Sequence, residues 1–122
     1  MTRAVRGAIK VEANSVPQIG NASVRLIDEM RRENGIAENF IVSIIFSLTA
    51  DLTAANPATA LRTAGFAETP LFCTQEAQVD GGMPRVIRAL LTFESLERRR
   101  IVPVYLDGAE ALRPDLRGGN GS

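Results

Sequence analysis

The chain has 122 residues, no net charge, 45% hydrophobic residues, a single cysteine and no histidine. This composition is ordinary for one globular domain, and the balanced charge gives no indication of the basic surface typical of a nucleic-acid-binding protein. The lack of histidine excludes Ser-His-Asp and Cys-His catalysis, and a single cysteine supplies neither an internal disulfide nor an ordinary zinc site.

The first third of the chain predicts a strand and then a helix. Residues 4–12 alternate with the two-residue period of a strand. Ser15 with Gln18 resembles a helix capping box. Apolar residues then recur at helical spacing, and Asn34-Gly35 is expected to end the helix.

An almost continuously apolar run, residues 40–49, follows the helix and is rich in β-branched side chains. Such a run predicts a strand that is covered on both faces. Together with the preceding strand and helix it forms a βαβ unit, for which a right-handed crossover is expected.

The second half of the chain predicts shorter elements. Asn56 and Pro57 begin a short helix that runs to about residue 64. After it come a strand at 70–75, a longer strand at 84–94, a charged loop at 94–100, a strand at 102–106 and a short strand at 109–113. We expect residues 1–116 to form one domain and the glycine-rich residues 117–122 to form a flexible tail.

These elements predict an α/β (α+β) fold: a mixed sheet of about five strands with one long helix and one short helix. One long helix cannot cover both faces of such a sheet, so a second copy of the chain is expected to cover the other face. A lone cysteine fits a reducing cytosol. The N-terminus has no apolar signal core and no apolar run approaches the roughly 18 residues of a membrane span, so a soluble, cytoplasmic protein is expected.

Arg88 is the clearest anomaly in the chain. It interrupts an apolar strand face between Val86 and Leu90, where an unpaired charge would be costly. Two interpretations stay open from spacing alone. Arg88 lies at an edge or in a structural ion pair, with Glu76 or Glu94 as partner, or it lies in a dry cleft where it meets an anion.

Five other side chains have ordinary structural interpretations when each is taken singly. They are Arg6 as a solvent-facing strand residue, Arg62 as a solvated helix charge, Cys73 as a small buried hydrophobe, Tyr105 as a half-buried strand aromatic and Arg113 as a surface residue. A site made only of Arg, Tyr, Glu and Cys would suit a small dicarboxylate whose reaction needs neither proton transfer nor a covalent intermediate.

The combination of these residues resembles the small trimeric chorismate mutases with a pseudo-α/β-barrel, as distinct from the all-helical ones. The matching residues run in family order and are Arg6-Gly7-Ala8, Val11-Glu12, Asp51-Leu52, Pro57-Ala58, Arg62, Cys73, Gln75-Glu76, Gly81-Gly82, Arg88, Val104-Tyr105-Leu106 and Leu112-Arg113-Pro114-Asp115-Leu116. The resemblance implies a homotrimer with active sites between subunits, no cofactor and no metal. It also implies the Claisen rearrangement of chorismate to prephenate, a step towards phenylalanine and tyrosine.

The resemblance also implies roles for individual residues. Arg88 would donate to the ether oxygen of the substrate, where negative charge gathers, and to a carboxylate. Arg6 and Tyr105 would hold carboxylate, while Glu76 and Cys73 would contact the ring hydroxyl.

Further residues would shape the rim of the pocket. Arg62 and Arg113 would line its entrance and attract the dianion, and backbone around Phe72 and Cys73 would form part of its wall. The tail would close over the substrate.

Three positions depart from the family pattern. Thr59 stands where some members have lysine, Asn56 where an aromatic residue can occur, and Pro103 where histidine is frequent. These departures affect charge at the entrance more than the reaction. Two alternatives stay open: a hydrolase similar to the trimeric imine deaminases, and a non-catalytic trimer that binds a carboxylate metabolite.

Overall fold

The computed structural model describes residues 1–113, so the tail predicted at 117–122 lies outside the described residues. The elements in chain order are β1 (Thr2–Lys10), α1 (Val16–Asn34), η1 (Glu38–Phe40), β2 (Ile41–Leu48), α2 (Pro57–Thr63), β3 (Leu71–Gln75), β4 (Val86–Glu94), β5 (Val104–Leu106) and η2 (Ala109–Leu112). The two η elements are short 3₁₀ helices.

One predicted element is wrong. The segment expected to form a short strand at 109–113 contains the 3₁₀ helix η2 instead. The physical cause lies just before it, because Asp107 and Gly108 both have left-handed backbone conformations, with φ of 56° and 100°. Two such residues in succession turn the chain out of the sheet after β5.

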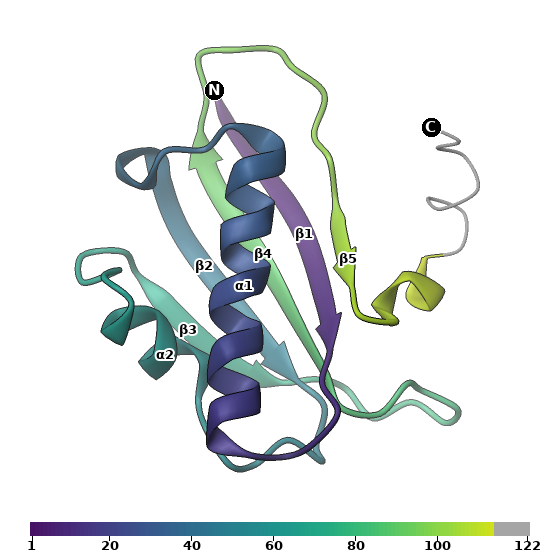
Figure 1. Cartoon of the computed structure of the whole chain (residues 1–122). Helices are drawn as coiled ribbons and strands as arrows, with labels where there is room; N and C mark the ends of the chain where they lie inside the picture. Colours follow the sequence, from purple (N-terminus) through teal and green to yellow (C-terminus); the bar gives the residue numbers. More distant parts are fainter. Residues whose placement is uncertain (114–122) are drawn as a thin grey trace.

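The five strands form one mixed sheet in the order β3-β2-β4-β1-β5. The central strand β4 is antiparallel to both β1 and β2, whereas β5 is parallel to β1 and β3 is parallel to β2. The predicted unit of strand, helix and strand is therefore split, since β4 lies between its two strands. Figure 1 shows α1 running across one face of the sheet, with α2 beside it near β3.

The caps predicted for the long helix are confirmed. Ser15 is the N-cap of α1, and its side chain accepts a hydrogen bond from the backbone N–H of Gln18 at 3.3 Å. Gly35 ends the helix in a left-handed conformation with φ of 61°, and its N–H donates to the carbonyl of Arg31. Among the described residues, no helix is both long enough and apolar enough to cross a lipid bilayer.

The hydrophobic core lies between α1 and the sheet. Its fully buried members are Val5, Ile9, Ile19, Leu26, Ile27, Met30, Ile44, Phe46, Leu61, Ile87 and Leu91. Gly7 allows the helix to approach β1 closely, because a Cβ added there would lie 2.5 Å from Sδ of Met30.

The prediction that the second strand is covered on both faces is wrong for a single chain. Ile44 and Phe46 of β2 are buried, but Val42 and Ile45 are 43% and 40% exposed. The helices cover only one face of the sheet (Figure 1), so Ile45, between the buried Ile44 and Phe46, faces outward. Val42 has the parity of the buried residues but lies at the register irregularity between Ile41 and Ser43. This agrees with the expectation that one long helix leaves a face uncovered.

Candidate active site

The candidate site lies on the face of the sheet opposite to α1. Strand register brings three of the predicted residues to that face. Arg88 on β4 pairs with Ala8 on β1, and Tyr105 on β5 pairs with the same alanine. Arg6 is two residues before Ala8 on β1. Since paired residues and residues two apart share a face, Arg6, Arg88 and Tyr105 point to the same side.

These side chains border an open cavity of about 240 Å³. Its lining residues are Arg6, Gly7, Ile45, Ser47, Arg88, Ala89, Leu90 and Tyr105. The floor is thus largely apolar, and the charged groups sit at its margin.

Arg88 forms an ion pair with Glu76, one of the two partners that the spacing allowed. Its Nε lies 2.7 Å from Oε1 and 3.0 Å from Oε2 of the carboxylate. Glu76 follows β3, and its backbone N–H donates to the carbonyl of Leu48 at 2.7 Å. The hydroxyl of Ser47 donates to Oε1 of Glu76 at 3.1 Å. The carboxylate therefore receives one charged and one neutral donor.

The ion pair leaves most of the guanidinium of Arg88 available. Within residues 1–113, its Nη1 and Nη2 atoms make no hydrogen bond. The side chain is 40% exposed, against 23% for Glu76. The two interpretations of Arg88 are thus compatible, because one edge of the guanidinium binds Glu76 while the other can meet an anion.

Two other polar side chains at the cavity, Arg6 and Tyr105, are also without partners among the described residues. Neither the guanidinium of Arg6 nor the hydroxyl of Tyr105 donates to a described group. Two arginines against one carboxylate leave net positive charge here. Together these groups form a set of donors suited to a dianion, and Arg can bind a carboxylate with two parallel hydrogen bonds.

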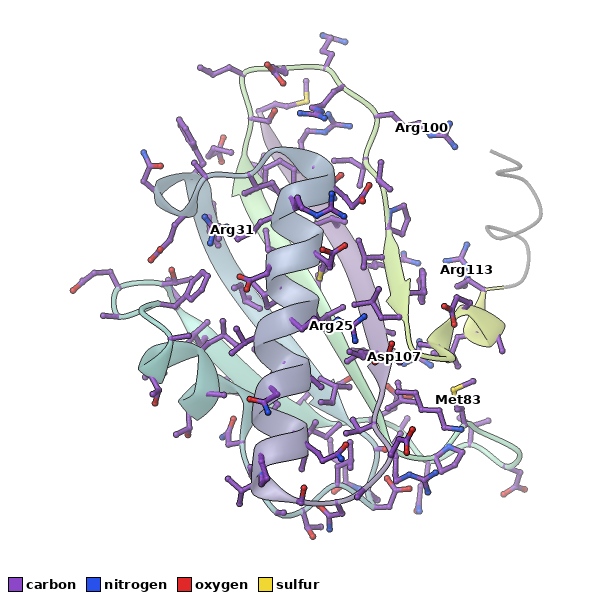
Figure 2. The ribbon with its side chains drawn as sticks, viewed as in Figure 1. Arg25, Arg31, Met83, Arg100, Asp107 and Arg113 are labelled. Carbon is purple, nitrogen blue, oxygen red and sulfur yellow. The ribbon has the colours of Figure 1, made fainter. Side chains whose placement is uncertain are left out.

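A second cavity of about 480 Å³ also includes Arg88 and Glu76 in its lining. It extends toward Asp51, the 77–84 loop and Leu112 of η2. Arg113 follows η2, and its N–H donates to the carbonyl of Glu110 at 3.2 Å. Figure 2 shows Arg113 beside η2, apart from the Arg25–Asp107 pair, whose Nη1 and Oδ2 atoms lie 2.6 Å apart. Arg113 thus directly follows Leu112, which lines this cavity, but Arg113 is not itself among the lining residues.

Three of the predicted residues lie away from Arg88 in the single chain. Cys73 pairs with Phe46 and packs against the core, and burial raises the pKa of its thiol. Phe72 is 64% exposed at the edge strand β3, and Arg62 is exposed on α2. None of the three lines either cavity that contains Arg88.

Each of the three residues that depart from the family pattern lies in or directly beside a helix or strand. Asn56 caps α2, because its Oδ1 accepts from the N–H of Ala58 at 2.8 Å. Thr59 is exposed on the same helix. Pro103 directly precedes β5 and is half-buried.

Sequence reasoning missed Ser47, which binds Glu76 and lines the first cavity. A signal was present in the apolar run. Its polar members are Ser43, Ser47 and Thr49, and all three have the same strand parity as Ile45. In the described part of the chain, no three Cys, Asp or Glu side chains gather as a group that could hold a metal ion.

Comparison with known proteins identifies the family of this chain. Residues 2–116 match the family described as chorismate mutase type I. The chain is 41% identical over 118 residues to chorismate mutase AroH of Thermus thermophilus, covering 95% of this chain and 97% of that protein. It is 35% identical over 118 residues to chorismate mutase AroH of Bacillus subtilis, covering 95% and 93%.

A solved structure agrees with these relatives. The chorismate mutase from Clostridium thermocellum superposes with a TM-score of 0.86 at 38% identity, covering 89% of this chain and 98% of that one. Both the sequence and the fold match over nearly the whole length. The chain therefore belongs to the type I chorismate mutase family.

Proposed function

We propose that this protein is a chorismate mutase, an isomerase that converts chorismate to prephenate for aromatic amino-acid biosynthesis. The family match over residues 2–116 supports the activity. The single observation that supports the mechanism is the set of unpartnered donors at one cavity: Arg6, Tyr105 and the Nη atoms of Arg88.

The reaction is an intramolecular rearrangement, in which the ether C–O bond breaks as a new C–C bond forms. It needs no base and no nucleophile, in agreement with a sequence that has no histidine. The enzyme must hold the flexible side chain of the substrate over its ring. It must also stabilise the negative charge that develops on the ether oxygen.

Arg88 is placed to supply that stabilisation. With Nε held by Glu76, its Nη groups can donate to the ether oxygen and to a carboxylate. Arg6 and Tyr105 bind carboxylate at the other margin of the cavity. The apolar floor offers no competing hydrogen-bonding groups, and each of these interactions is stronger once water is excluded. Glu76 faces the electron-poor ring and contacts its hydroxyl.

We infer that the active enzyme is a homotrimer, with each site completed by a neighbouring subunit. Large apolar side chains on or beside the sheet are exposed in the single chain, namely Phe40, Val42, Ile45, Phe72 and Leu90. Such a patch is typical of an association surface. Arg62, Phe72 and Cys73, which lie at the β3–α2 edge, then reach the Arg88 cavity of the neighbour. Arg113 stays at the entrance of that cavity.

The pseudo-α/β-barrel architecture belongs to that trimer. Light scattering at micromolar concentration is expected to give about three times the chain mass of 13.2 kDa. A monomer of full activity would contradict the shared site. We also infer a cytoplasmic location, which the single cysteine favours.

One assay tests the activity. Purified protein is mixed with chorismate, and loss of chorismate absorbance is followed together with the appearance of prephenate. Turnover is expected. A hydrolase of the imine deaminase kind would leave chorismate unchanged, and a metabolite-binding protein would bind it without turnover.

The same assay tests the role of Arg88. Arg88→Ala is expected to lose about 100- to 1000-fold in kcat, as on removal of one oxyanion donor. Arg25→Ala is the matched control, because Arg25 also pairs with a carboxylate, that of Asp107, but lies on α1. Equal kcat values for the two variants would exclude Arg88 from the chemistry.

A further inference from the structure

The start of β4 is held by a network that the mechanism above does not use. Arg85 directly precedes β4 and has φ of 53°, a left-handed conformation unfavourable for a residue with a Cβ. The Asp51 carboxylate accepts the N–H of Arg85 with both oxygens, at 3.1 and 3.0 Å. The carbonyl of Arg85 accepts from the N–H of Val11 at 2.8 Å. The Nε of the Arg85 side chain donates to the carbonyl of Val11 at 3.0 Å. Hydrogen bonds to Asp51 and to Val11 thus both hold Arg85 in this unfavourable conformation.

Thr49 holds the next residue, Val86, by two hydrogen bonds. Its N–H donates to the carbonyl of Val86 at 3.1 Å, and its Oγ1 accepts from the N–H of Val86 at 3.0 Å. The hydroxyl of Thr49 in turn donates to Oδ1 of Asp51 at 2.6 Å. In a regular sheet a backbone carbonyl would accept the N–H of Val86, but here the hydroxyl of Thr49 accepts it. Asp51 orients that hydroxyl. Every backbone donor and acceptor of residues 85–86 is engaged.

Arg88 lies two residues beyond Val86 and shares its strand face. A shift at the start of β4 therefore moves the guanidinium. The same end of β2 also holds the partner of Arg88, because Ser47 and the carbonyl of Leu48 both bind Glu76. One short segment, residues 47–51, thus positions both members of the ion pair.

We propose that Thr49 and Asp51 are positioning residues for Arg88. They fix where β4 begins and in which direction it leaves the loop, and so aim the Nη atoms into the cavity. This inference rests on the role proposed for Arg88. A misplacement of about 1 Å by a residue remote from the chemistry can cost about 100-fold in rate.

The first test compares two loop clamps of similar form. Asp51→Ala removes a carboxylate that accepts Arg85 N–H. Asn14→Ala removes an amide oxygen that accepts from the N–H groups of Thr53 and Ala54, each at 2.9 Å. Both act on the loop after β2, but only Asp51 binds the residue before β4. Asp51→Ala is expected to lower kcat about 10- to 100-fold, while Asn14→Ala keeps kcat near that of the unmodified enzyme.

A second pair of variants serves if Asp51→Ala does not fold. Thr49→Val keeps the shape of the side chain but removes the hydroxyl, whereas Thr49→Ser keeps the hydroxyl. We expect Thr49→Val to lower kcat and Thr49→Ser to restore most of it, with both proteins folded by circular dichroism. Equal kcat for the valine and serine variants would overturn the proposal.

A double-mutant cycle separates positioning from general loss of structure. If Asp51 acts through Arg88, then Asp51→Ala has little further effect in the Arg88→Ala background. An equal fold-loss in both backgrounds would mean that Asp51 acts independently of Arg88, and the proposal would fail. Normal kcat in Arg88→Ala alone would instead refute the mechanism proposed above, so the two failures are distinguishable.

Discussion

The face of the sheet beneath α1 and the opposite face differ in what their side chains contact. On β2, Ile44 and Phe46 are completely buried against the helix side. Ile45, which lies between them in the chain, is 40% exposed. Ser47, which follows Phe46, binds Glu76. A shift of register by one residue would exchange these two sets. Apolar burial on one face therefore fixes the register that presents polar groups on the other.

The largest effect expected from this division is on stability, at the helix-covered face. Phe46→Ala removes a fully buried aromatic ring and is expected to lower the free energy of unfolding by about 3–5 kcal/mol. Urea denaturation at one fixed protein concentration measures this, since the association that we propose would also contribute to stability. A loss below about 1 kcal/mol would show that the ring is not a core contact.

The next effect concerns activity, at the open face. Arg88→Lys keeps a positive charge but cannot donate two parallel hydrogen bonds. We expect kcat to fall about 100-fold or more, while the free energy of unfolding changes by less than about 1 kcal/mol, because the Glu76 pair is partly exposed. Steady-state kinetics and urea denaturation measure the two. Near-normal turnover would refute the bidentate role.

The helix-covered face is where local pattern was most informative. The N-cap at Ser15 and the stop at Gly35 depend on residues a few positions apart, so both could be predicted from the chain. The position of β4 between β1 and β2 could not, because it depends on pairing between distant segments. The turn at Asp107 was missed because aspartate only sometimes adopts positive φ.

On the open face, sequence pattern identified some of the site residues and missed another. Arg88 was identifiable because a charge interrupts an apolar face, and Glu76 was one of two partners at a suitable spacing. Ser47 was not identified, because a serine within a strand has many ordinary explanations. Cys73 and Arg62 line neither of the two cavities described at Arg88, so a role for them in the site rests on the neighbouring subunit that we propose.

A smaller effect tests how closely α1 approaches the sheet. Gly7→Ala places a Cβ 2.5 Å from Sδ of Met30 and is expected to cost about 1–3 kcal/mol by overpacking. Gly20→Ala is the matched control, because its Cβ would lie 3.6 Å from that of Ala60, an ordinary contact. That variant is expected to stabilise the helix by about 0.5–1 kcal/mol. Thermal denaturation compares them, and equal shifts would contradict the close approach.

The smallest effect on activity is expected at Cys73, which lies on the helix-covered side within its own chain. Cys73→Ser keeps a hydrogen-bonding group, and loss of one neutral hydrogen bond is worth about tenfold in kcat at most. Steady-state kinetics on the folded variant measure it. Complete inactivation of the folded protein would point to covalent chemistry instead.

The ionisation of Cys73 independently tests whether its thiol takes part in covalent chemistry. Burial raises the pKa of the thiol above its ordinary value of 9.0, so the folded protein prefers the neutral form. The associated stability is fully present below the pKa of the unfolded chain and is lost as pH rises through the higher folded value. The unmodified protein should therefore lose stability more steeply above pH 9 than Cys73→Ser does.

The thiolate is the reactive form, so alkylation of Cys73 by iodoacetamide at neutral pH should be slower in the folded protein than in urea. Faster alkylation of the folded protein would mean an activated thiol, which a rearrangement without a nucleophile does not need.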